Sequence, residues 1–457
     1  MTAHTSLPTI LKQRRERLAK KFPDKALLWS GCAPARNFPA NTFPFRPSSH
    51  FLYFAGLFLE NAVIELDNGK LTLFMDNPSS ESILWGGEQP SRDQIATQIG
   101  ADRAYPLAEL SPADPDIATI ALFEPTTYQQ QCHCLQRAIP QPSLATGKDL
   151  ALIEAIIELR LSHDQGAIAQ IRQAAEVSIQ AHQAGMQATE AGKTEAEIRA
   201  AMEGIMIAHN QPPAYGSIVT VHGNVLHNHD YSHPLQEGDL LLADVGAESK
   251  GGYASDITRT WPVSGKFSPT QQEIYDLVLA AHDACIAMVA PDVEYKEIHW
   301  QAARIITKGL VEIGILKGNV SDLLAKDAHA LFFPHGVGHL LGLDVHDMED
   351  LGDLAGYAPG RKRSERFGLG NLRLDRALQT GMTLTIEPGF YQVPAILNDP
   401  QTHETYGDMI NWERLQQFSD VRGIRIENDV LVTSEGAEVL TTSLPCQRDQ
   451  IESLTQG

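Results

Sequence analysis

Four acidic residues in the second part of the chain stand at the edges of apolar segments that have the composition of buried strands. They are Asp244 after Leu240-Leu241-Leu242-Ala243, Asp256 before Ile257-Thr258, Glu387 after Leu384-Thr385-Ile386 and Glu427 after Gly423-Ile424-Arg425-Ile426. One carboxylate at such a position is usually the partner of a cation in a salt bridge, because an unpaired charge is costly to bury. Four brought together would repel one another unless cations lay between them. Two divalent ions would balance their charge, so the pattern predicts a metal site.

A glycine turn joins the first two of these acids. Asp244 and Asp256 flank Gly251-Gly252, and a hairpin at this turn is expected to bring the two carboxylates face to face.

Two histidines occupy a glycine-rich segment, Pro334-His335-Gly336-Val337-Gly338-His339. On a helix, the HxxxH spacing would offer two metal ligands on one face, but the glycines favour a loop. We therefore expect His339 to bind metal and His335 to face a substrate. A histidine buried in the core is the common alternative for an isolated residue, and it is weakened here because His346 and Asp347 follow closely.

The length and the run of apolar segments predict two domains. A chain of 457 residues exceeds what one hydrophobic core usually supports. We place the boundary near residue 160, with a small α/β domain over 1–160 and an α+β domain over 161–457. In the first domain the expected strands are 26–29, 51–54, 62–66 and 71–74. In the second, long helices are expected over 271–290 and 298–313.

The charge and the cysteines limit the partners and the compartment. A formal net charge of −21 argues against a nucleic acid or an anionic membrane as a partner. The segment 1–22 lacks the apolar core of a signal peptide, and no apolar run has the ~20 residues that cross a bilayer. The five cysteines show no CxxC pair, so free thiols in a reducing cytoplasm are expected.

Several ordered segments resemble the aminopeptidase P and prolidase family of peptidases, which adopt the pita-bread fold with a curved, mostly antiparallel sheet. They are LLADVGAE, GGYASDITRTWP, FFPHGVGHLLGLDVHD, TIEPGFY and GIRIEND, which together span roughly residues 160 to 440. The N-terminal segments RRERLAKK, FPFRPSSHFLYFAGL and ILWGGEQ are similar to the N-terminal domain of the same family. One departure is an extra residue between Asp244 and Asp256, which we interpret as an addition to the glycine turn.

This resemblance implies a two-metal peptidase that hydrolyses the bond between an N-terminal residue and a following proline. The metal ligands would be Asp244 on one ion, His339 and Glu387 on the other, with Asp256 and Glu427 bridging both. Oxygen ligands with a single imidazole favour Mn²⁺, with Co²⁺ or Zn²⁺ as alternatives.

The resemblance also implies roles for the residues around the metals. Glu387 would transfer protons, and His227, His335 and His346 would complete the catalytic group. The remaining expected roles are orientation of a metal-binding carboxylate by Arg425, and substrate contacts by Arg373, Tyr215 and Trp85. The family tryptophan that Trp85 matches closes the site of an adjacent subunit, which predicts a homo-oligomer, either a dimer or a tetramer.

The resemblance leaves two activities open, an aminopeptidase and a dipeptidase. The N-terminal segments favour an aminopeptidase that accepts longer peptides, and we prefer this interpretation. The long interval between His346 and Glu387 and the arginine at 373 are more typical of prolidase, which is restricted to dipeptides. A non-catalytic pita-bread binding protein and a metal-free hydrolase similar to creatinase are both disfavoured, because all five metal-ligand positions are filled.

Overall fold

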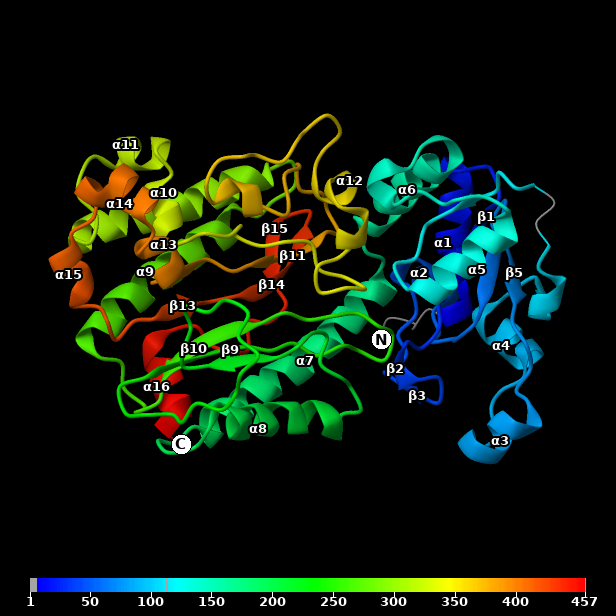
Figure 1. Cartoon of the computed structure of the whole chain (residues 1–457), viewed down its shortest axis with the longest axis horizontal. Coiled ribbons are helices and arrows are strands. Elements are labelled where there is room, and N and C mark those ends of the chain that lie inside the picture. The colour runs from blue at the N-terminus through cyan, green and yellow to red at the C-terminus, as the bar shows by residue number, and fades with distance from the viewer. Residues whose placement is uncertain (1–5, 112–113, 457) are drawn as a thin grey trace. The chain divides into compact units, whose positions relative to one another are not determined.

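The computed structural model describes residues 6–111 and 114–456, and the chain divides into two compact units (Figure 1). The first unit extends up to Leu161 and also includes Met348–Ala355. The second comprises Ser162–Asp347 and the residues from Gly356 onward. A short segment from late in the chain therefore packs with the first unit, which a single boundary near residue 160 does not describe.

The first unit is an α/β structure around a five-stranded mixed sheet of order β6-β5-β4-β1-β7. Its β4–β5 hairpin turns on Asn68 and Gly69, both with positive φ (48° and 79°), which two-residue hairpins favour. The strands are β1 (Ala26–Trp29), β4 (Val63–Asp67), β5 (Lys70–Phe74), β6 (Arg103–Tyr105) and β7 (Ala118–Thr119), with a separate pair β2 (Ala35–Phe38) and β3 (Asn41–Thr42). The helices are α1 (Leu7–Lys21), α2 (Ser49–Ala55), α3 (Ser80–Gly86), α4 (Arg92–Ile99), α5 (Pro125–Leu135) and α6 (Gly147–Arg160).

The strand predicted over 51–54 is wrong, because this segment lies within helix α2. All seven residues of Ser49–Ala55 are buried, and the helix ends at Gly56 in the left-handed conformation (φ 67°). A short segment that is apolar on every side carries no periodicity, so it cannot be assigned to helix or strand from its pattern alone.

The second unit combines antiparallel sheets with two pairs of long helices (Figure 1). Helix α7 packs on α8, which contacts β8 in the sheet β10-β9-β8, and α9 packs on α10 and also contacts β11, β12, β13 and β15. The strands are β8 (Ile218–Thr220), β9 (Leu240–Asp244), β10 (Thr258–Pro262), β11 (Thr383–Ile386), β12 (Gly389–Tyr391), β13 (Gly423–Arg425), β14 (Asn428–Thr433) and β15 (Gly436–Val439). The longer helices are α7 (Gln165–Ala188), α8 (Glu195–Ala208), α9 (Pro269–Met288), α10 (Tyr295–Ile313) and α16 (Arg448–Gln456), and the short ones are α11 (Val320–Ala325), α13 (Pro394–Leu397), α14 (Pro400–Tyr406) and α15 (Trp412–Gln416). The short helix α12 (Asp353–Gly356) lies at the end of the late segment that belongs to the first unit.

Local sequence signals set the ends of these helices and their close packing. Thr194 and Glu197 form a capping box at the start of α8, as their spacing predicts. Gly185 of α7 faces Met202 of α8, where a Cβ would come within 2.7 Å of the methionine Cγ. Only a glycine therefore allows these two helices to approach so closely. In residues 6–111 and 114–456, no helix is both long and apolar enough to span a membrane.

Candidate active site

Asp244 and Asp256 lie close together near the ends of β9 and β10, although the two residues are not paired in the sheet. Asp244 closes β9 and lies opposite Thr258, so Asp256 belongs to the connection that precedes β10. The expected face-to-face pair is therefore absent from the register. The carboxylates converge all the same, because the hydroxyl of Tyr215 lies 2.6 Å from an oxygen of each.

The two glutamates come from one end of a second antiparallel pair. Ile386 of β11 lies opposite Asn428 of β14, so Glu387, one residue after β11, and Glu427, one residue before β14, emerge side by side. The hydroxyl of Thr258 donates to Glu427 Oε2 (2.7 Å) and so joins this pair of strands to β10. Together, the strand ends and the connection before β10 bring four carboxylates into one group.

His339 joins the four carboxylates from a loop whose conformation requires a glycine at position 338. A Cβ at Gly338 would come within 2.1 Å of the Thr385 carbonyl oxygen, so only glycine lets the loop pair with β11. The His339 Nδ1 hydrogen-bonds the Leu340 carbonyl (2.9 Å), which leaves Nε2 as the acceptor, 3.3 Å from Asp256 and 3.6 Å from Glu387. One ligand atom each from Asp256, His339 and Glu427 lies within 4.8 Å of the others. This donor set fits a divalent metal ion.

The pKa values of the four carboxylates also favour a bound cation. Burial raises the pKa of Asp244 and of Asp256, raises that of Glu387 to about 8 and raises that of Glu427 well above its usual value. Repulsion from the neighbouring carboxylates adds to this effect at Asp244, Glu387 and Glu427. Negative charges arranged in this way are stabilised by cations placed between them.

Arg425 supplies a fixed positive charge behind the carboxylates. Its guanidinium is almost fully buried, and it donates to Asp244 Oδ2 (2.6 Å), to the Tyr391 hydroxyl (3.0 Å) and to the Thr258 hydroxyl (2.9 Å). These contacts match the orienting role expected for this arginine, and they hold one oxygen of Asp244 in place.

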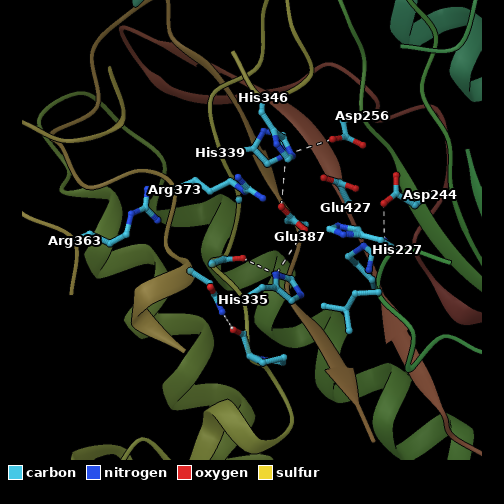
Figure 2. Close-up of a pocket in the computed structure, with 16 residues that line it drawn as sticks. His227, Asp244, Asp256, His335, His339, His346, Arg363, Arg373, Glu387 and Glu427 are labelled. Atoms are coloured by element: carbon cyan, nitrogen blue, oxygen red, sulfur yellow. Dashed lines mark hydrogen bonds and ion pairs between the residues drawn. The ribbon is translucent and has the colours of Figure 1, made fainter. Parts of the chain in front are cut away.

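A pocket of about 330 Å³ opens over the carboxylates and carries four histidines (Figure 2). The His335 Nε2 lies 2.9 Å from the Tyr391 hydroxyl, and the ring of His346 stands edge-on to that of His339 at 4.2 Å. Burial lowers the pKa of His335 and of His346 to about 3, that of His339 to about 4, and also that of His227. These imidazoles are therefore neutral near pH 7 and can act as ligands or as single hydrogen-bond donors.

The other side of the pocket is basic and is formed by loops. Arg363 and Arg373 lie on this side (Figure 2), and Asn371 also lines the pocket. Burial lowers the pKa of Arg373 and the nearby charge of Glu387 raises it, so this guanidinium faces the carboxylates across the pocket.

Two residues expected to contact substrate lie elsewhere. The Tyr215 hydroxyl is engaged by the carboxylates of Asp244 and Asp256, and Tyr215 is not among the residues that line the pocket. Trp85 lies on α3 of the first unit, and its side chain is 81% exposed. A substrate contact by either residue stays a prediction.

Several site residues were not predicted from the sequence. Tyr391 belongs to the TIEPGFY segment, and Thr258 lies beside Asp256 in GGYASDITRTWP, so the motifs that carried the family resemblance could have indicated both. Asn371 ends the short 3-10 helix Leu369–Asn371, and Arg363 lies in an irregular segment, so no spacing or periodicity marks either residue as part of a site.

The fold and the group of metal-binding side chains define a metallopeptidase. The chain belongs to metallopeptidase family M24, whose model matches residues 169–434, and residues 11–119 match the aminopeptidase P N-terminal domain. It is similar to the Xaa-Pro aminopeptidase of Escherichia coli, with 31% identity over 97% of this chain and 96% of the relative, and to a probable Xaa-Pro aminopeptidase of Talaromyces marneffei, with 33% identity over 91% and 88%.

Solved structures agree with this assignment. A glutamate-to-alanine variant of Escherichia coli aminopeptidase P in complex with substrate matches with a TM-score of 0.81 and 29% identity, over 99% of both chains. Pseudomonas aeruginosa aminopeptidase PepP matches with a TM-score of 0.79 and 31% identity, over 98% of both. The predicted family and the predicted fold, an N-terminal domain followed by a pita-bread domain with mostly antiparallel, open sheets, are confirmed.

Proposed function

We propose that this chain is an Xaa-Pro aminopeptidase, which hydrolyses the bond between an N-terminal residue and a following proline. The observation that carries the proposal is the convergence of four carboxylates, two of them buried and two half-buried, with His339 in one pocket. The names of the relatives support it, since they are called Xaa-Pro aminopeptidases. A tertiary Xaa-Pro amide lacks the N–H that general peptidases grip, so a dedicated site is required.

The proposed site holds two divalent ions. Asp244 would bind one, His339 and Glu387 the other, and Asp256 and Glu427 both. Four carboxylates with one imidazole favour Mn²⁺, with Co²⁺ or Zn²⁺ as alternatives. Ions bound in this way supply a water whose pKa is lowered towards neutrality and a Lewis acid for the scissile carbonyl.

The protein side chains would then move the protons and hold the substrate. Glu387 would accept a proton from the attacking water and deliver it to the leaving proline nitrogen. His227 and His346, kept neutral by burial, would donate to the substrate and to the oxyanion. His335 lies 3.7 Å from Glu387 Oε2 and would orient that carboxylate and the substrate.

A dipeptidase restricted to Xaa-Pro is the second candidate function. It is favoured by Arg373, a guanidinium on the pocket wall that is suited to a terminal carboxylate.

Peptide cleavage by the full chain tests the proposal. With Mn²⁺ bound, the protein should release alanine from Ala-Pro-Ala but leave Ala-Ala-Ala intact, as followed by mass spectrometry, and it should lose activity on dialysis against a chelator. Hydrolysis of Ala-Pro alone would make it a dipeptidase. Protein with verified metal content that cleaves neither proline peptide would refute the proposed function.

We also propose a homo-oligomer in the cytoplasm. The exposed Trp85 supports assembly, because an indole with this exposure is suited to a contact with another chain, and the free thiols of all five cysteines support a reducing compartment. Trp85→Ala should shift the protein towards monomer in light scattering. A wild type that is monomeric and fully active at micromolar concentration would contradict this assembly.

A further inference from the structure

His227 reaches the pocket from the loop of residues 221–239, which joins β8 to β9 (Figure 2). Both of its neighbours in the chain are held in place. Leu226 packs against a buried apolar cluster that includes side chains of β8 and β9. Asn228 is buried, and its side-chain Nδ2 donates to the Thr220 hydroxyl (2.8 Å). The position of this histidine therefore depends on how the loop is anchored.

Glu195, the first residue of α8, anchors both ends of the loop segment that carries the histidine. Its side chain is fully buried (0% exposed). The Oε1 atom accepts hydrogen bonds from the Val221 N–H (2.7 Å) and from the Thr220 hydroxyl (2.9 Å). The Oε2 atom lies 2.9 Å from Nδ1 of His233. One carboxylate thus joins the two ends of the segment 221–233.

The backbone at the start of α8 binds the same segment. The N–H groups in the first turn of a helix have no partner within the helix. The N–H of Glu195 donates to the His233 carbonyl (3.1 Å). That of Ala196 donates to the Tyr231 carbonyl (3.0 Å), and the guanidinium of Arg199 lies over the Tyr231 ring, 4.3 Å from its centre. The loop is therefore docked on α8 by side chains and backbone together.

We propose that Glu195 is a positioning residue for catalysis, which holds the segment 221–233 on α8 and so sets the place of His227 in the pocket. The inference rests on the proposed function, in which this histidine donates to the substrate and the oxyanion. A misplacement of about 1 Å at a catalytic group can cost about a hundredfold in rate. Because Glu195 is connected to His227 through Thr220 and Asn228, its loss should matter only while the histidine is present.

The test is a double-variant cycle on Ala-Pro-Ala with Mn²⁺-loaded protein. Glu195→Ala should lower kcat/KM by about ten- to a hundredfold and leave the metal content unchanged. Added to His227→Ala, the same change should cost no more than about twofold further, because residues that act through one another are not additive. Glu195→Gln, which keeps an acceptor oxygen for the Val221 N–H, should retain most of the activity. Glu197→Ala removes an exposed carboxylate that caps Thr194 at the same helix end and should behave as the wild type.

Hydrogen exchange gives a readout that does not depend on activity. Glu195→Ala should speed the amide exchange of peptides that cover 221–233 by about tenfold or more, while α9 exchanges as in the wild type. Thr220→Val, which removes the bridging hydroxyl from β8, should give the same pattern. It takes the place of Glu195→Ala in the cycle if that variant does not fold.

Four results would overturn the inference. Unchanged exchange over 221–233 would show that Glu195 does not hold the loop. Losses that multiply in the double variant would indicate a general effect on the fold. An unimpaired His227→Ala would remove the residue through which Glu195 acts, and a Glu195→Gln as impaired as Glu195→Ala would contradict positioning by hydrogen bonds. Absence of Xaa-Pro hydrolysis by the metal-loaded wild type refutes the proposed function instead, and exchange then still decides whether Glu195 holds the loop.

Discussion

The two walls of the pocket are built in opposite ways. The acidic wall, formed by Asp244, Asp256, Glu387 and Glu427, lies at or next to the ends of paired strands. The basic wall, formed by Arg363, Asn371 and Arg373, stands on irregular segments held by glycine contacts and bonds to carbonyls. A wall of buried like charges needs a rigid support and a cation, whereas a wall that receives a substrate can be carried by loops.

This contrast assigns metal binding to the acidic wall and substrate length to the basic wall. Changes on the acidic wall should therefore alter metal content and affect all peptides alike. Changes on the basic wall should leave the metal in place and alter the choice among peptides.

The largest effect is expected at Asp256, the proposed bridging ligand. Asp256→Asn removes a charge from both metal sites, so kcat/KM should fall by about a thousandfold or more on every peptide, and metal content by elemental analysis should drop. Asp322→Asn, on the exposed surface of α11, is the matched control. A variant with full metal content and normal activity would show that Asp256 is not a ligand.

A variant of Tyr215 tests whether its hydroxyl orients the aspartates of the acidic wall. Its hydroxyl contacts both Asp244 and Asp256, so Tyr215→Phe should weaken metal binding by about ten- to a hundredfold, as loss of a residue that orients ligands does. Titration with Mn²⁺ should then restore most of kcat at saturation. Unchanged metal affinity together with a raised KM would favour the substrate contact predicted from the sequence.

The contrast between the walls also explains what the sequence could predict. Each acid stands beside an apolar strand, so its type and place were visible, and the ordered motifs carried the family. The antiparallel register that puts Thr258 opposite Asp244 was missed, because the residues that leave the ladder in a connection cannot be counted from composition. Arg363 was missed because it lies in an irregular segment, where its hydrogen bonds to the carbonyls of Gly370 and Leu372 follow no periodicity that the sequence could show.

On the basic wall, a variant of Arg373 tests the choice between dipeptides and longer peptides. If it binds the carboxylate of a C-terminal proline, Arg373→Ala should slow Ala-Pro hydrolysis by roughly ten- to a hundredfold. Ala-Pro-Ala should be affected far less, because its proline carbonyl is uncharged. Measurement of kcat/KM on both peptides checks this, and an equal loss on both would assign Arg373 to the fold or to the metal site.

The smallest effect concerns a buried cluster of aromatic rings that contacts His335 through Phe333. Phe333 precedes the loop of His335 and packs on His299, with ring centres 5.5 Å apart, and His329 lies 6.2 Å from His299. Neither nitrogen of His299 or His329 has a hydrogen-bond partner among the residues that the structure describes. Burial lowers the pKa of His299 to about 3 and that of His329 to about 4, so both are neutral in the folded protein near pH 7.

Acid should therefore destabilise the fold at this cluster. Below the ordinary histidine pKa the unfolded chain binds protons that the folded chain excludes, so the free energy of unfolding falls as pH falls. For His299 the loss between pH 7 and 5.5 is about 1.3 kcal/mol. His299→Leu should remove that share of the pH dependence in urea unfolding, whatever its effect at pH 7, while the exposed His209→Leu should keep the wild-type slope. The metal ligands are the same in all three proteins, so they do not change the comparison. If the free energy of unfolding of His299→Leu depended on pH as steeply as that of the wild type, His299 would have a hydrogen-bond partner in solution, such as a buried water.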